Sequence, residues 1–229
     1  MPRILSASVV LLALAMVLPV PVRADTPLEN HVISRDAYAV FTSESECTTV
    51  SVYVNSSTNF FFPAHGAGGG VTKQGLTSLA IIVEDTCVAA QSMSVYAAGG
   101  GGAVVADWLG QTQAALAVHG NLNEAHLVAT IPMVDGVSGA ESIATVDLTW
   151  TATGPDLVRP SHIHLRYPKA VVVNSNSNDT LRDATASGTV FFDGVNLTPQ
   201  PTEGILSATR FHCRQIGFAQ IGSDWDQCY

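Results

Sequence analysis

The sequence predicts an all-β protein, an antiparallel β-sandwich or jelly-roll-like fold stapled by disulfides. Apolar and polar residues alternate at period two, as in the run 144–150, which is typical of a strand with one buried face. β-Branched residues fill segments such as 48–54 and 171–173. Helical patterning is weak, with 104–113 as its best candidate, and the close spacing of the segments excludes βαβ units.

About ten segments have the character of strands. In chain order they are 36–43, 46–55, 78–85, 87–97, 112–119, 125–134, 142–153, 161–174, 186–193 and 205–215. The alternation is clearest in 125–134, 142–153 and 161–174, and the other segments are assigned from their β-branched and aromatic content. The Asn-rich run 174–179 is expected to form a polar hairpin loop, and a calcium site is the alternative because the run places oxygens at alternating positions.

Residues 1–24 are predicted to be a cleaved secretory signal. Arg3 supplies the positive charge, residues 9–20 supply the apolar stretch, and small residues precede the cleavage position. A membrane anchor is the competing interpretation, but the apolar run is too short to span a bilayer. The remaining chain, 25–229, is expected to be a secreted single domain, with 134–141 as a candidate boundary between two halves.

The four cysteines form an even set, which suits an exported protein with disulfides. Three pairings are open, and we favour Cys47–Cys87 with Cys213–Cys228 because these cysteines are neighbours along the chain. A zinc site is the alternative, although no C-x-x-C spacing supports it.

The composition excludes several classes of partner. The 229 residues carry 10 Lys and Arg against 19 Asp and Glu, a net charge of −9, which disfavours nucleic acid and anionic lipid. Charged residues are only 13% of the chain and apolar residues are 47%, enough to build a core. No later segment approaches 18 continuous apolar residues, so no membrane insertion is expected after signal removal.

Two segments resemble motifs of a known group of proteins. Residues 149–155 (TWTATGP) and 182–190 (RDATASGTV), the latter followed by GVNLTP at 194–199, resemble segments of uncharacterised secreted β proteins of bacteria, chiefly actinobacteria. The resemblance implies a secreted bacterial β protein. It implies no activity and no catalytic residue, because none is attached to the group.

The strongest candidate for a metal or binding site is the group of His162, His164 and Arg166. Side chains two apart on a strand share one face, with Cα atoms about 6.5–7 Å apart. Two imidazoles so placed suit zinc or copper, provided that folding brings a third ligand such as His119, His126 or His212. The simpler interpretation is the solvent face of an amphipathic strand.

A second strand repeats this pattern. Arg210, His212 and Arg214 alternate with Phe211 and Cys213, so the basic side chains are expected to point away from the core. If this strand lies beside the one bearing His162, both form a basic patch that favours a carboxylated or sulfated partner. The alternative is that charges on exposed strands discourage pairing with other chains.

The hypothesis from the sequence is a secreted, non-catalytic binding or surface-associated module for an anionic or glycan ligand. The sequence lacks G-x-S-x-G, S-x-x-K with its supporting motifs, and H-E-x-x-H, so we do not favour an enzyme. No cofactor is expected. Two alternatives stay open: an exported metal-dependent hydrolase with His162 and His164 as ligands, and a purely structural envelope or matrix component.

Overall fold

The computed structural model describes residues 28–63, 69–88, 103–167 and 171–216. These residues form antiparallel strands and no helix, which confirms the predicted all-β class. The strands are β1 (Leu28–Glu44), β2 (Thr48–Phe62), β3 (Thr72–Asp85), β4 (Ala103–Thr112), β5 (Ala117–Val118), β6 (Glu124–Asp135), β7 (Glu141–Ala152), β8 (Leu157–Tyr167), β9 (Val171–Phe192), β10 (Val195–Asn196) and β11 (Thr202–Ile216). No helix in the described part of the chain is long and apolar enough to cross a membrane. The predicted signal lies outside the described residues.

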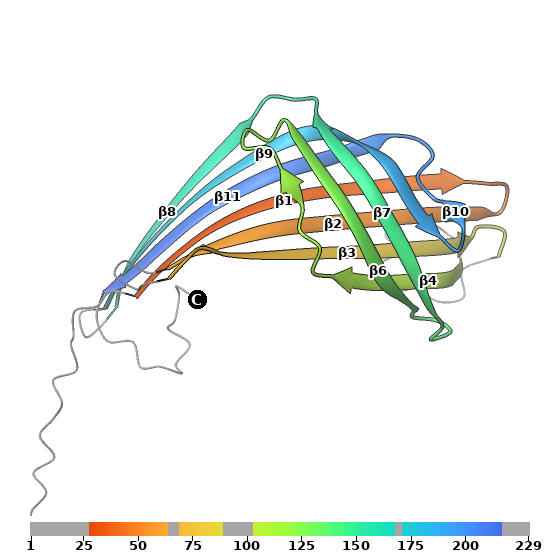
Figure 1. Ribbon diagram of the computed structural model, residues 1–229, viewed down its shortest axis with the longest axis horizontal. Coiled ribbons are helices and arrows are strands. Elements are labelled where there is room, and N and C mark those ends of the chain that lie inside the picture. The colour runs from red at the N-terminus through yellow and green to blue at the C-terminus, as the bar shows by residue number, and fades with distance from the viewer. Residues whose placement is uncertain (1–27, 64–68, 89–102, 168–170, 217–229) are drawn as a thin grey trace, which may run out of the picture.

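The strands form one sheet that closes on itself. Neighbouring strands follow the order β9, β11, β1, β2, β3, β4, β6, and β7 then pairs with both β6 and β9. The short strands β5 and β10 pair with β6 and β9. In Figure 1, β6 and β7 cross in front of the long strands, so the closed sheet has two layers, as expected of a sandwich.

The core lies between these two layers. Residues of β6 and β7 alternate between buried and exposed along most of each strand, which agrees with the period-two pattern of the sequence. The buried apolar side chains include Leu127, Ile131 and Leu148 from the covering layer and Val52 and Leu79 from the long strands. A single apolar cluster therefore joins both layers.

Trp150 on β7 connects the covering layer to β1 and β11. Its side chain is fully buried, and its Nε1 donates a hydrogen bond to the Tyr38 carbonyl at 3.1 Å. Gly204 of β11 lies against the indole, since a Cβ there would stand 2.9 Å from Trp150 Cδ1 and 2.8 Å from the Tyr38 oxygen. The absent side chain of Gly204 makes room for the tryptophan.

Two expectations about local structure are wrong. Residues 104–112 of the helical candidate 104–113 lie in strand β4, because pairing with β3 satisfies their backbone and overrides the weak helical pattern. The run 174–179 is no loop, since it lies within the 22-residue strand β9 and pairs with β8 on one side and β11 on the other.

Two further features bear on the domain and disulfide predictions. The stretch 134–141 forms the turn of the β6–β7 hairpin, where Asp135 N donates to the Ala140 carbonyl at 2.9 Å. The predicted Cys47–Cys87 disulfide is confirmed, and its cysteines are 40 residues apart in sequence. Cys228, the predicted partner of Cys213, lies outside the described residues.

One edge of β9 is shared by two strands in succession. β7 pairs with residues 184–192 of β9, and β8 pairs with residues 171–181. Between them, the amides of Thr153 and Gly154 both donate to the Asp183 carbonyl, at 2.8 and 3.3 Å. At this break β7 bends into the covering layer, whereas β8 continues beside β9 (Figure 1).

Beyond the break the described strands extend as a single layer, which we call the wing. The wing comprises residues 28–35, 59–62, 72–75, 157–167, 171–182 and 209–216. Arg182 holds its base, because its Nε donates to the Gly154 carbonyl at 2.8 Å and its Nη1 to the Asn121 carbonyl at 3.2 Å. One face of the wing continues the core-facing side of the long strands and is the face that matters for the site.

We expect Trp150→Ala to lower the free energy of unfolding by about 3–5 kcal/mol, because it opens a cavity between the layers and removes the bond to Tyr38. Urea denaturation of the variant and the parent chain measures the difference. Val128→Ala is the control, since Val128 is 63% exposed on the outer side of β6 and its loss should cost less than about 0.5 kcal/mol. Equal losses in the two variants would contradict this account of the core.

Candidate functional site

The structure brings the six predicted site residues to one face of the wing. β8 and β11 are not direct neighbours, as they flank β9 on either side. His162 and His212 both lie opposite Asn176, and His164 and Arg214 both lie opposite Asn174. Because partners across a ladder point to the same side, the histidines and arginines share a face with an asparagine between them.

This face is the open continuation of the core-facing side. Leu206 of β11 and Ala184 of β9 are buried in the core, and residues at even spacing from them point the same way. We call this surface the wing face. It comprises Glu29, His31, Ile33, Arg35, Phe60, Phe62, Lys73, His162, His164, Arg166, Asn174, Asn176, Asn178, Arg210, His212 and Arg214.

The asparagines of β9 hold the two histidines of β8. His162 Nδ1 is hydrogen-bonded to Asn176 Oδ1, and His164 Nδ1 is hydrogen-bonded to Asn174 Oδ1. An amide oxygen only accepts, so both Nδ1 atoms carry the proton. Arg166 Nε then donates to His164 Nε2 at 3.2 Å. The imidazoles are therefore oriented by their neighbours.

β1 adds a histidine, an arginine and an acid that the sequence analysis did not include. Glu29 Oε1 accepts a hydrogen bond from His212 Nε2 at 2.6 Å. His31 stacks on Phe62 with ring centroids 4.5 Å apart and meets His212 edge-on at 5.8 Å. Arg35 Nη1 donates to the Val118 carbonyl at 3.1 Å, where the wing meets the covering layer.

An aromatic side chain sits among the cations of this edge. The ring of Phe60 on β2 lies 5.6 Å from Arg35 Cζ and 6.0 Å from Lys73 Nζ on β3, distances at which a cation is attracted to a ring. In the sequence, the run of three phenylalanines at 60–62 is the signal that could indicate this aromatic site. Its place became clear only because β1 and β2 extend beyond the predicted segments 36–43 and 46–55.

A hollow opens where the wing face meets the covering layer. Its volume is about 260 Å³, and its lining includes Arg210, Asn178, Thr180, Asn121 and Asp156. These side chains offer one cation, one carboxylate, and hydroxyl or amide groups. Such a mixture suits hydrogen bonding to a hydroxylated ligand, with Arg210 available to an acidic group.

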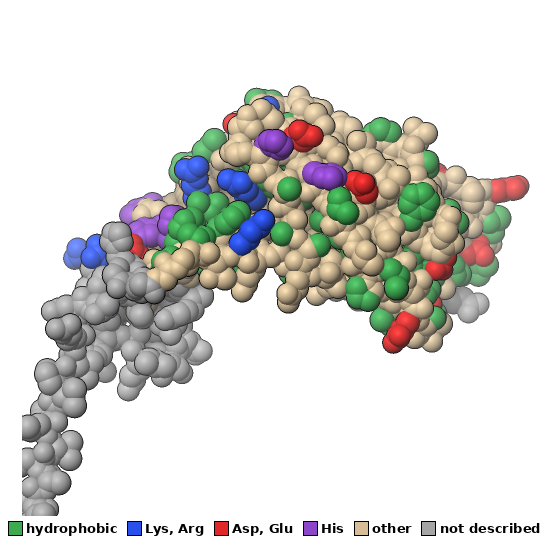
Figure 2. Space-filling view, viewed as in Figure 1, with side chains coloured by type: hydrophobic (Ala, Val, Ile, Leu, Met, Phe, Trp, Pro, Cys, Tyr) green, Lys and Arg blue, Asp and Glu red, His purple; other side chains and the backbone are tan. Residues whose placement is uncertain are grey.

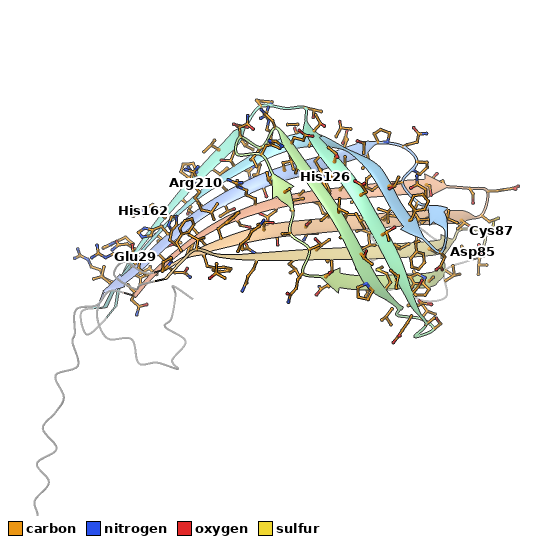
Figure 3. The ribbon with its side chains drawn as sticks, viewed as in Figure 1. Glu29, Asp85, Cys87, His126, His162 and Arg210 are labelled. Atoms are coloured by element: carbon orange, nitrogen blue, oxygen red, sulfur yellow. A yellow bond between two sulfur atoms is a disulfide. The ribbon has the colours of Figure 1, made fainter. Side chains whose placement is uncertain are left out.

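Charge is strongly segregated along the molecule. All seven Lys and Arg side chains in the described residues lie on the wing: Arg35, Lys73, Arg159, Arg166, Arg182, Arg210 and Arg214. The opposite end carries the acids Glu44, Glu46, Glu84, Asp85, Asp107, Asp135, Glu141 and Asp193. Figure 2 shows most of the blue side chains at the wing and several red ones at the other end, with purple and red side chains side by side between them, and Figure 3 places Arg210 and His162 far from Asp85.

The histidines proposed as a third metal ligand lie elsewhere. His126, on the outer side of β6, bonds to Asp147 Oδ1 at 2.9 Å, and His119 lies 3.9 Å from Glu124. His212 shares the wing face but is bonded to Glu29. Within the described ranges no group of three or more His, Cys, Asp or Glu is placed to hold a metal ion. The geometry around His162 and His164 is that of a hydrogen-bonded surface.

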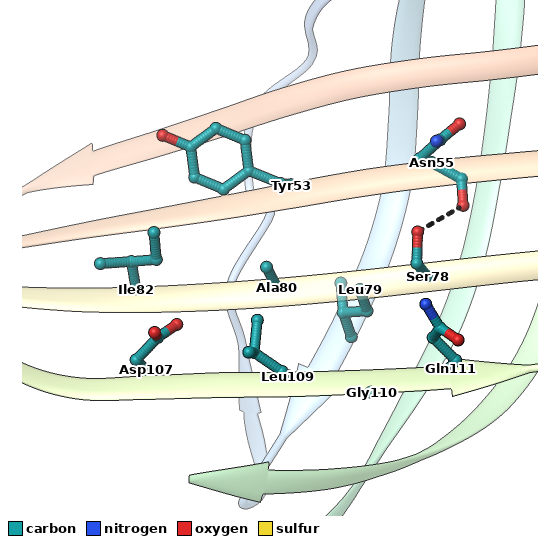
Figure 4. A pocket seen from close by; sticks show the side chains of 10 residues that line it. All are labelled: Tyr53, Asn55, Ser78, Leu79, Ala80, Ile82, Asp107, Leu109, Gly110 and Gln111. Atoms are coloured by element: carbon teal, nitrogen blue, oxygen red, sulfur yellow. Dashed lines mark hydrogen bonds between the residues drawn. The ribbon is translucent and has the colours of Figure 1, made fainter. Parts of the chain in front are cut away.

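A second concavity lies on the outer side of β2, β3 and β4. It is a groove of about 790 Å³, shown in Figure 4, in which the small side chains of Ser78 and Ala80 run between Tyr53 and Leu109. Its one charged residue is Asp107. The sequence analysis did not find it, because its walls come from three strands whose order was unknown. None of the predicted site residues lines it.

Comparisons with known proteins add no assignment: no family model, no curated protein and no solved structure matches the chain.

Asp36 lies at the base of the wing on the side opposite the wing face. Burial raises the pKa of its carboxyl, an effect that hydrogen bonds from Ser34 and Ser207 partly oppose. A raised pKa in the folded state means that ionisation of Asp36 opposes folding, so stability falls as pH rises through the folded pKa.

We therefore expect Asp36→Asn to raise Tm at about pH 7, by about 2–4 °C for each kcal/mol gained. The gain should disappear near pH 3, where Asp36 is protonated in both folded and unfolded chains. Calorimetry at the two pH values measures it, with Asp193→Asn, an exposed acid at the far end, as the control. A gain of equal size at both pH values would contradict the burial argument.

Proposed function

We propose that the protein is a secreted, non-catalytic module that binds an anionic polymer, such as a sulfated or carboxylated glycan, on its wing face. The observation that carries the proposal is the gathering of cations on one open face of an otherwise acidic chain. The confirmed disulfide is compatible with export, which would bring the protein to extracellular glycans.

The donors of the wing face suit repeated anionic groups. Arg210 and Arg214 lie four residues apart on β11, with His212 between them on the same face. Arg166 lies two strands away on β8. Neighbouring strands are about 4.8 Å apart and successive same-face residues about 6.5–7 Å apart, so the six strands of the wing offer donors over roughly 20–25 Å in each direction. A polymer with many acidic groups can contact several of these donors at once, whereas a small anion can contact only one or two.

Other features of the face suit a sugar polymer in particular. Arginine makes paired hydrogen bonds to carboxylate or sulfate, and the amides of Asn176 and Asn178 can bond to hydroxyl groups. Phe60 and Phe62 supply apolar surface for the carbon face of a sugar ring. The acidic end repels a polyanion, which favours approach through the wing.

We expect Arg166→Ala combined with Arg210→Ala to weaken binding to immobilised heparin, a sulfated polymer, by about thirtyfold, at about 1 kcal/mol per arginine. The slope of affinity against salt concentration should fall as well, because fewer ionic contacts remain. Biolayer interferometry at several salt concentrations measures both quantities.

The control variant is Arg159→Ala, which removes one positive charge from β8, the strand that carries Arg166. Arg159 is exposed and lies opposite Asp179 on the far face of β8, so its loss should change the affinity by less than about threefold. Polygalacturonate, a carboxylated polymer, is tested in parallel. Absence of binding to both polymers, or equal losses in the Arg159 variant and the double variant, would overturn the proposal.

A further inference from the structure

Four histidines lie on the wing face, and three of them occupy one row across the strands. The row runs Phe62, His31, His212, Asn176 and His162, from β2 through β1, β11 and β9 to β8. His164 lies in the next row, opposite Asn174. Histidine is the side chain that ordinarily changes its charge between about pH 5 and 8, so this row can alter the charge of the whole face.

The fixed charges around the row are nearly all positive. The charged groups facing it are Arg166 on β8, Arg210 and Arg214 on β11, Glu29 and Arg35 on β1, and Lys73 on β3. At the base of the wing, Arg182 and Asp156 form an ion pair with Nε and Oδ1 3.5 Å apart. β2 contributes Phe60 and Phe62, which do not titrate. Glu29 is the one acid among the described residues of this face, and it is bonded to His212.

We propose that acid strengthens polyanion binding by protonating the imidazoles of the wing face, so that the module holds its ligand more tightly near pH 5.5 than at neutral pH. This inference rests on the proposed function. Protonation adds up to four positive charges to a face on which five cations, Arg35, Lys73, Arg166, Arg210 and Arg214, oppose one carboxylate. It also turns each imidazole into a donor at both nitrogens.

The four histidines do not contribute equally. Protonation of His162 at Nε2 adds a donor without disturbing its bond to Asn176. His31 contacts Phe62 and His212 through its ring, and no carboxylate is bonded to it in the contacts described. The charge on His212 is offset by Glu29, and protonation of His164 at Nε2 removes the acceptor of Arg166. His31 and His162 are therefore the principal groups.

The test measures affinity of the whole chain for immobilised heparin and for polygalacturonate at about pH 7.5 and 5.5, at constant ionic strength. We expect binding about tenfold tighter at the lower pH. His31→Gln combined with His162→Gln should reduce this ratio to about threefold or less, because the two principal imidazoles are no longer there to be protonated. His162→Gln with His164→Gln, both exposed on β8, is the second variant if the first does not fold.

The matched control replaces the two histidines of the covering layer. His119→Gln with His126→Gln removes imidazoles that lie beside Glu124 and Asp147, away from the wing, and should keep the full pH ratio. A ratio near one in the parent chain, or one that survives in the wing-face variants, would overturn this inference and leave the proposed function intact. Absence of binding at both pH values would instead overturn the proposed function.

Discussion

The pairing of β9 with two successive strands is the constraint on which the rest of the structure depends. β9 is 22 residues long, whereas β7 pairs with residues 184–192 alone and, with its other edge, pairs with β6 in the covering layer. β8 pairs with the remainder of β9 and stays in the layer of the long strands. The closed part of the sheet buries a core between two layers, and the open part exposes the same side of β1, β9 and β11 to solvent.

Residues from two segments of the sequence stabilise the junction between the closed part of the sheet and the wing. The segments 149–155 and 182–190 lie side by side in the β7–β9 ladder, with Trp150 opposite Ala186. Trp150 stabilises the closed part by its hydrogen bond to the Tyr38 carbonyl. Arg182 stabilises the base of the wing by its hydrogen bonds to the carbonyls of Gly154 and Asn121. Contacts made by these two segments thus account for how the fold is divided into a closed part and the wing.

The proposed function rests on the unequal distribution of charge between the wing and the opposite end of the molecule. A protein with a net charge of −9 is a poor binder of polyanions if its charges are mixed, because repulsion opposes approach from every side. Here the cations lie on the wing and many of the acids at the far end, so the chain presents a cationic surface in one orientation. Imidazoles held by Asn174 and Asn176 lie among the arginines, and the proposed pH dependence of ligand binding rests on this arrangement.

The sequence by itself determined the strand character, the two-faced alternation and the Cys47–Cys87 pair, because these follow from local spacing. It also indicated that His162, His164, Arg166, Arg210, His212 and Arg214 point away from the core, since side chains alternate along any strand. Only the tertiary structure decided that β8 and β11 share β9 as a neighbour, that β1 and β2 reach far enough to add His31 and Phe62, and that 174–179 is strand. The physical reason is that ladder pairing joins residues far apart in sequence, such as His31 and His212, and no local pattern specifies which strand becomes the neighbour of which.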